Sequence, residues 1–168
     1  MKTRNLTFLV FAICTFIFSP AGAQTVTRTQ HRAAIAKDAV STGTMTIRKP
    51  DYICISTDQG REQLIMDGTK FTITLGGKQH ATDSRKNPQF VTFHSVLTAV
   101  INGQPIPQGG EVSVTTKGNK TAIIVTPAGK KKRQLFTSFA LTVNAKTKAF
   151  YTLRMNGRGE DYIEYEFK

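Results

Sequence analysis

The segment Leu64-Ile65-Met66-Asp67-Gly68-Thr69-Lys70-Phe71-Thr72-Ile73-Thr74-Leu75 carries the clearest fold signal in this sequence. Asp67 and Gly68 tolerate positive φ angles, and they separate two runs that are rich in apolar and β-branched residues. This pattern predicts a β-hairpin. In the second run apolar residues alternate with threonines, so one face of the hairpin is expected to be apolar and the other polar.

The same chemistry recurs along most of the chain. Further turn signals occur at Asp58-Gln59-Gly60, Gly76-Gly77, Gly118-Asn119 and Asn156-Gly157. The alternation predicts an apolar face made by Met45, Ile47, Ile53, Ile55, Phe71, Ile73, Leu75, Leu135, Thr137, Phe139, Leu141, Val143, Tyr151, Leu153, Met155, Ile163, Tyr165 and Phe167. We therefore expect a mainly β fold with minor α content, an antiparallel sheet or barrel of about ten strands.

One stretch breaks the strand period. Between Asn87 and Gly103 the apolar residues recur at helical spacing, at Phe90, Phe93, Leu97, Val100 and Ile101. Asn87 is a suitable N-cap, Pro88 suits the first helical position, and Gly103 suits the position after the end. This amphipathic helix is expected to cover the apolar face of the sheet, because no other surface can bury its apolar stripe.

The N-terminus has the pattern of a secretory signal peptide. Lys2 and Arg4 precede an apolar run over residues 6–18, and Ala21 and Ala23 supply the small side chains of a cleavage site. We expect cleavage after Ala23, which leaves residues 24–168 as a single exported domain, in the periplasm if the cell has two membranes. An uncleaved membrane anchor is the alternative, although the run is shorter than the ~20 residues of a spanning helix.

The two cysteines exclude two other arrangements. Cys14 lies inside the apolar run with no small residue directly before it, so we expect no lipid anchor. Cys54 is the single cysteine after the predicted cleavage site, so an internal disulfide in residues 24–168 is impossible.

The chain is strongly basic. Its formal net charge is +12, and removal of Lys2 and Arg4 lowers it to +10. Such a charge favours an acidic partner, and export makes nucleic acid the least suitable one. One hypothesis is therefore a module that docks on an anionic membrane or an acidic protein through its basic surface. The densest cluster, at residues 130–133, follows Pro127-Ala128-Gly129, and a solvated loop tip is the simpler interpretation of it.

The sequence gives little support for catalysis. His31, His80 and His94 are dispersed, without a second ligand at metal-binding spacing. Glu164 and Glu166 share one strand face, but they alternate with apolar residues, as on a solvated outer face. A hydrolase that uses Glu164, Glu166 or His94 is the last of our hypotheses, and we expect no enzyme, metal or cofactor.

The predicted apolar face allows two interpretations. A sheet that curls without closing, with one helix over it, encloses a trough that suits acyl chains. An ordinary core filled by side chains beneath the helix fits the same pattern.

Two segments resemble the periplasmic outer-membrane lipoprotein carriers of the LolA type. They are Gly43-Thr44-Met45-Thr46-Ile47-Arg48-Lys49-Pro50 and Leu64-Ile65-Met66-Asp67-Gly68-Thr69-Lys70-Phe71. In that family a glycine precedes a strand that ends in a basic residue and proline, and an Asp-Gly hairpin leads into an aromatic-rich strand. The resemblance implies an incomplete antiparallel barrel with helices as a lid over a cavity for lipoprotein acyl chains. It also implies a shuttle between inner-membrane release machinery and an outer-membrane acceptor.

The resemblance turns the apolar face into a candidate lipid site. Its expected lining is Met45, Ile47, Ile53, Ile55, Leu64, Met66, Phe71, Ile73, Phe90, Phe93, Leu97, Val100, Phe139 and Leu141. The family places an arginine before the proline as a lid latch, whereas this chain has Lys49, which lacks the guanidinium fork. Cleavage after Ala23 also leaves no place for the family's first helix, so we expect a minimal member with one lid helix.

Overall fold

The computed structural model describes residues 23–34, 38–128 and 135–168. In these ranges the chain forms eleven strands, one α-helix and two short 3₁₀ helices. They are β1 (Gln24–His31), β2 (Ala39–Arg48), β3 (Tyr52–Thr57), η1 (Asp58–Gly60), β4 (Glu62–Asp67), β5 (Lys70–Leu75), β6 (Lys78–Asp83), η2 (Ser84–Lys86), α1 (Pro88–Asn102), β7 (Val112–Lys117), β8 (Lys120–Val125), β9 (Ser138–Asn144), β10 (Phe150–Asn156) and β11 (Tyr162–Phe167). The predicted mainly β fold with one amphipathic helix is confirmed.

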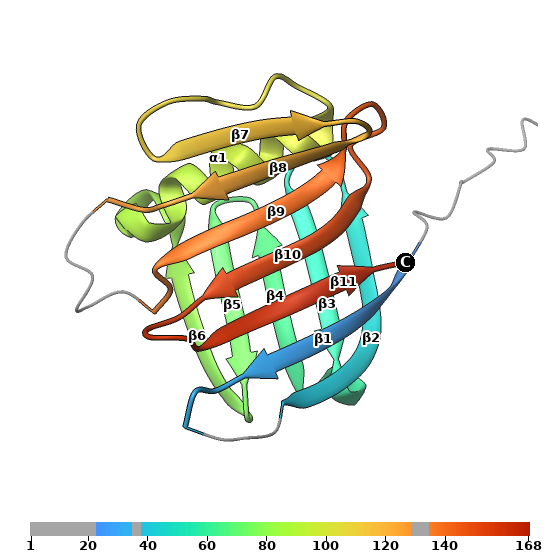
Figure 1. The fold of residues 1–168 in the computed structure, drawn as a ribbon. Helices are drawn as coiled ribbons and strands as arrows, with labels where there is room; N and C mark the ends of the chain where they lie inside the picture. Colours follow the sequence, from blue (N-terminus) through green and yellow to red (C-terminus); the bar gives the residue numbers. More distant parts are fainter. Residues whose placement is uncertain (1–22, 35–37, 129–134) are drawn as a thin grey trace, which may run out of the picture.

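All the strands belong to one antiparallel sheet that does not close. Their order is β6-β5-β4-β3-β2-β1-β11-β10-β9-β8-β7, so β6 and β7 form its two edges. β1 joins the two halves because it pairs with β2 on one side and with β11 on the other. The sheet folds back on itself: in Figure 1 β9, β10 and β11 cross in front of β3–β6, and β7 and β8 lie in front of α1.

The hydrophobic core lies between the two halves of the sheet and α1. Phe93 of α1 stacks on Phe139 of β9 with 4.1 Å between ring centroids, and it lies 6.0 Å from Phe71 of β5. The helix therefore contacts both halves of the sheet. Aromatic pairs of this kind add about 0.5–1.5 kcal/mol beyond the burial of their area.

The helix begins and ends where the sequence predicts. The Asn87 side chain accepts a hydrogen bond from the backbone N–H of Gln89, as an N-cap does, and Pro88 is the first helical residue. Gly103 follows the last turn with φ 65°, the left-handed conformation that glycine adopts at low cost. The apolar stripe with Phe93 and Leu97 is the face that meets the sheet.

The hairpin predicted at Asp67-Gly68 is confirmed, with the turn displaced by one residue. Asp67 pairs with Lys70, so the two turn residues are Gly68 and Thr69. Gly68 has φ 55°, which accounts for the glycine at this position.

The predicted faces are wrong at the start of β9. The alternation placed Leu135 and Thr137 on the apolar face, but β9 begins at Ser138, Leu135 is 45% exposed and Phe136 is buried. Gln89 of α1 is the physical reason, because its side-chain amide bonds to the backbone N–H of Leu135 and to the carbonyl of Phe136. These bonds to α1 set the orientation of Leu135 and Phe136, which precede the first residue of β9.

A second shift occurs at the start of β10. Phe150 is buried, whereas the predicted inner residue Tyr151 lies within 5.4 Å of the exposed Lys120 Nζ. The pairing with β9 skips a residue between Phe150 and Thr152, which is a β-bulge. Leu153 and Met155 return to the inner face as predicted.

Gly43 marks the closest approach of two strands. It lies within β2 rather than before it, opposite Thr57 of β3. A Cβ atom added at Gly43 would lie 1.9 Å from the carbonyl oxygen of Ser56, which is backbone and cannot move aside. Only glycine fits at this point of the sheet.

We therefore expect Gly43→Ala to lower the free energy of unfolding by about 1–3 kcal/mol, because β2 and β3 must separate to admit the methyl group. Urea unfolding followed by circular dichroism measures the change. Thr44→Ala, at the next and exposed position of β2, is the control and should change stability by less than about 0.5 kcal/mol. Equal stability of the two variants would contradict the close approach.

Candidate functional site

The residues predicted to line a lipid site gather in one place. Thirteen of the fourteen are buried, and Ile47 is partly buried against them. They come from β2, β3, β4, β5, α1 and β9, so they represent both halves of the sheet and the helix between them. Placement on one face does not by itself make these side chains ligand contacts.

The interior is filled by side chains in this conformation. The void within it has a volume of about 10 Å³. It is lined by Met45, Ile53, Ile55, Leu64, Met66, Phe71, Leu97, Phe150, Leu153 and Phe167. A space of this size is at the lower limit for one water molecule, so an acyl chain can enter only if α1 or the lining side chains move.

A larger cavity lies beside the N-terminal end of α1. Its volume is about 160 Å³, and its walls are Phe71, Ile73, His80, Ala81, Thr82, Asn87, Gln89, Phe90 and Leu135. Phe71 also lines the interior void, and it is the one residue that the two linings share. The ring of Phe71 is held by a stack on Phe90, with 5.0 Å between centroids.

Polar contacts hold α1 at both of its ends. Near the N-terminal end the buried Gln89 Nε2 donates to the Phe136 carbonyl at 3.0 Å, and Thr92 bonds to the carboxylate of Glu111. At the C-terminal end Asn102 Nδ2 donates to the Pro50 carbonyl at 2.7 Å. Between these points the contacts of the inner helix face are apolar side chains such as Phe93 and Leu97.

The loop at Lys49 and Pro50 is where the helix is tied to the first half of the sheet. The side chain of Lys49 is exposed, and the tie is the bond from Asn102 to the Pro50 carbonyl. The latch role of Lys49 stays a prediction. Sequence reasoning missed Asn102, although an asparagine directly before the helix-ending glycine was a usable signal.

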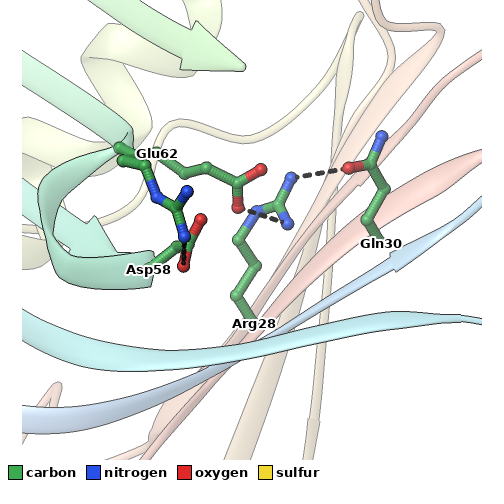
Figure 2. Close-up of polar contacts among 5 residues, drawn as sticks. Arg28, Gln30, Asp58 and Glu62 are labelled. Atoms are coloured by element: carbon green, nitrogen blue, oxygen red, sulfur yellow. Dashed lines mark hydrogen bonds and ion pairs between the residues drawn. The ribbon is translucent and has the colours of Figure 1, made fainter. Parts of the chain in front are cut away.

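A buried ion pair lies at the opposite end of β3 and β4. Arg28 of β1 is 1% exposed, its Nη1 lies 2.6 Å from Glu62 Oε2, and its Nη2 donates to Gln30 Oε1 at 3.0 Å. Figure 2 shows the guanidinium of Arg28 reaching toward Glu62 at the start of β4. The pair thus connects β1 to β4 across the two strands that separate them in the sheet. Sequence reasoning did not find it, although Val26, Arg28 and Gln30 alternate with threonines.

Tyr165 of β11 lies opposite Arg28 in the strand register. Burial raises the pKa of the Tyr165 hydroxyl to about 12, although the charge and a hydrogen bond of Arg28 oppose the shift. Arg28, Glu62 and Tyr165 form a polar group within a mostly apolar interior.

The groups considered for catalysis do not come together. Glu164 and Glu166 lie on the outer face of β11, with Glu164 near Arg154 at 3.7 Å. His94 is half-buried on α1, with its ring 6.2 Å from that of Phe71 on the inner side of the sheet. Within the described ranges no three His, Cys, Asp or Glu side chains are placed to hold a metal ion.

Several sequence predictions concern other parts of the chain. The signal peptide, except Ala23, and the basic cluster at residues 130–133 lie outside the described residues. None of the helices in the described ranges has the length and apolar character needed to cross a membrane.

No family model matches this sequence, and no curated protein matches it. Among solved structures, the chain is similar to a LolA superfamily protein from Nitrosomonas europaea, with 8% identity, coverage of 89% of this chain and 85% of that chain, and a TM-score of 0.32. It is also similar to the Mycobacterium tuberculosis lipoprotein LppX, with 12% identity, 89% and 86% coverage, and a TM-score of 0.32. LprF from Mycobacterium bovis is 9% identical, the match covers 87% of this chain and 83% of that chain, and the TM-score is 0.31. Similarity at these identities and TM-scores concerns the fold alone.

We expect Glu62→Gln to destabilise the protein by about 3–5 kcal/mol, because it leaves the buried guanidinium of Arg28 without a counter-charge. The double variant Arg28→Met with Glu62→Gln should recover part of this loss. Urea unfolding of the single and double variants measures the coupling. The matched control is Asp58→Asn, which breaks the exposed Arg61–Asp58 pair and should cost less than about 1 kcal/mol. If Glu62→Gln lowers the free energy of unfolding by no more than Asp58→Asn does, the Arg28–Glu62 pair does not stabilise the fold as expected.

The Tyr165 hydroxyl gives a second expectation. Its pKa is raised from 10.0 to about 12, so the unfolded chain loses this proton first as pH rises. The stability that Tyr165 contributes is therefore fully present below pH 10.0 and is lost as the pH rises through about 12. Unfolding free energies measured on both sides of this interval should fall less steeply in Tyr165→Phe than in the unchanged protein. If the unfolding free energies of the two proteins fall equally with pH, the burial of the Tyr165 hydroxyl is contradicted.

Proposed function

We propose that this protein is an exported carrier that binds acyl chains, of lipids or lipoproteins, between the two halves of its sheet and beneath α1. The observation that carries the proposal is the position of Phe71, which lines both the cavity beside the helix and the void in the apolar interior. A movement of this side chain, together with a shift of α1, would join the two spaces into a single tunnel.

The energetics of opening support this proposal. When α1 moves outward, apolar side chains such as Phe93 and Leu97 lose contacts, and an entering acyl chain replaces these contacts at about 0.8 kcal/mol per buried CH₂. The polar ties of the helix, at Gln89, Thr92 and Asn102, are few, and water can satisfy these groups on opening. Met45 and Met66 line the void, and methionine side chains adapt readily to a ligand of irregular shape.

The wider carrier role belongs to the same proposal. Cleavage after Ala23 would release the domain into the periplasm, where inner-membrane release machinery would load it and an outer-membrane acceptor would unload it. In this scheme Lys49 and Asn102 lie at the point where α1 is held shut. The sequence resemblance to LolA-type carriers supports this order of events.

Uptake of a fluorescent fatty acid by the delipidated protein tests the proposal. Leu97→Glu should abolish uptake, because it places a carboxylate in the apolar lining. Val91→Glu is the matched control, since Val91 is on the same helix but 44% exposed, and it should bind as the unchanged protein does.

A second variant guards against loss of folding. Phe71→Ala removes a side chain that lines both spaces and should increase the rate of uptake while the domain remains folded, at a cost of about 3–5 kcal/mol in stability. No uptake of any acyl probe by the unchanged protein or by Phe71→Ala would contradict the proposed function.

A further inference from the structure

The net positive charge is confined to one part of the chain. Residues 112–159 contain ten Lys and Arg residues and no Asp or Glu. The rest of residues 24–168 contains eleven basic and eleven acidic residues, so it is neutral overall. The whole charge of +10 therefore belongs to the segment that spans β7, β8, β9 and β10.

Two neighbouring turns carry four of these ten basic residues. Lys117 and Lys120 flank the β7–β8 turn, and Lys146 and Lys148 belong to the β9–β10 turn. The turns touch, because the Ala145 N–H donates to the Asn119 carbonyl at 2.8 Å and Lys120 pairs with Asn144. We call these four residues the lysine patch.

The lysine patch lacks counter-charges within the described part of the chain. Its side-chain contacts there are with neutral groups: Lys148 Nζ donates to the Ala145 carbonyl at 3.0 Å, and Lys120 Nζ lies 5.4 Å from the Tyr151 ring centroid. Lys117, Lys120 and Lys146 are exposed. Four like charges on adjoining turns repel one another, and an anionic surface would relieve that repulsion within a Debye length of about 10 Å.

We infer that the lysine patch docks the protein on the surface of an anionic phospholipid bilayer. The patch consists of two hairpin tips rather than a groove, and its charges are flexible ammonium groups rather than guanidinium forks, which suits a fluid array of phosphates. The exposed large apolar residues of the described chain are Val40, Val91, Ile124 and Leu135, and none lies in these turns. Attachment is therefore electrostatic and reversible, without an inserted apolar anchor. A specific protein partner would instead call for aromatic or arginine anchors, which the patch lacks.

Co-sedimentation with vesicles tests this inference. The protein should bind vesicles of phosphatidylglycerol and phosphatidylcholine, should not bind vesicles of phosphatidylcholine alone, and should be released when salt rises from about 0.05 M to about 0.5 M. The triple variant Lys117→Gln, Lys120→Gln, Lys146→Gln should weaken binding on the order of 100-fold.

The matched control is Lys70→Gln, Lys78→Gln, Lys86→Gln, which removes the same charge from exposed positions outside residues 112–159. It should keep affinity within about threefold of the unchanged protein. Equal losses in the two triple variants would overturn the inference, because net charge alone would then explain binding. Absence of binding to the anionic vesicles, or retention by an acidic protein alone, would also overturn it. Acyl uptake is a separate readout, so this inference and the proposed function can fail independently.

Discussion

The contact of Phe93 with both halves of the sheet is the interaction on which the rest of the structure depends. A sheet that does not close has two edges and one continuous apolar face, and that face must be covered. In this chain the sheet folds back, and the ring of Phe93 fills the space between Phe139 on β9 and Phe71 on β5. The helix therefore acts as part of the core rather than as a cover added to a finished barrel.

The opposite end of the interior is closed by different chemistry. Asn102 ties the helix to Pro50, just before β3 begins, whereas Glu62 pairs with Thr57, the last residue of β3. The Arg28–Glu62 pair thus lies at the far end of these strands from the C-terminal tie of the helix. A buried ion pair tolerates little displacement, because each charge depends on the other for compensation. Apolar contacts are less directional than an ion pair. The end of the interior that the helix covers is therefore the end that can adapt to a bound ligand.

The elements that the sequence predicts well are those set by local chemistry. The ends of α1 follow from Asn87, Pro88 and Gly103, each of which acts within its own turn. The strand faces follow from alternation wherever no other element intervenes. The two errors, at Leu135 and at Tyr151, arise from a bond to Gln89 more than forty residues away in the chain and from a bulge against β9. The residues predicted to line a lipid site gather in one buried cluster. Their packing into one core depends on how the sheet folds back, which no local pattern encodes. For the same reason the partner of Arg28 could not be chosen among the acidic residues.

The distribution of charge places two kinds of binding in different parts of the fold: apolar ligands in the interior and an anionic surface on the outside. The interior holds mostly apolar side chains, together with the Arg28–Glu62 pair and a few neutral polar groups such as Gln89 and Thr57, so salt has little effect on what binds there. The outer charge lies on the β7–β10 part of the chain and is opposed by no acidic residue within residues 112–159. The lysine patch on two adjoining turns lets an anionic surface orient the molecule before any contact forms. Salt that screens the outer charge therefore changes where the protein attaches, but it does not change the environment of an apolar ligand in the interior. A carrier built in this way can leave a surface without first releasing what it holds, because attachment and cargo binding draw on different forces.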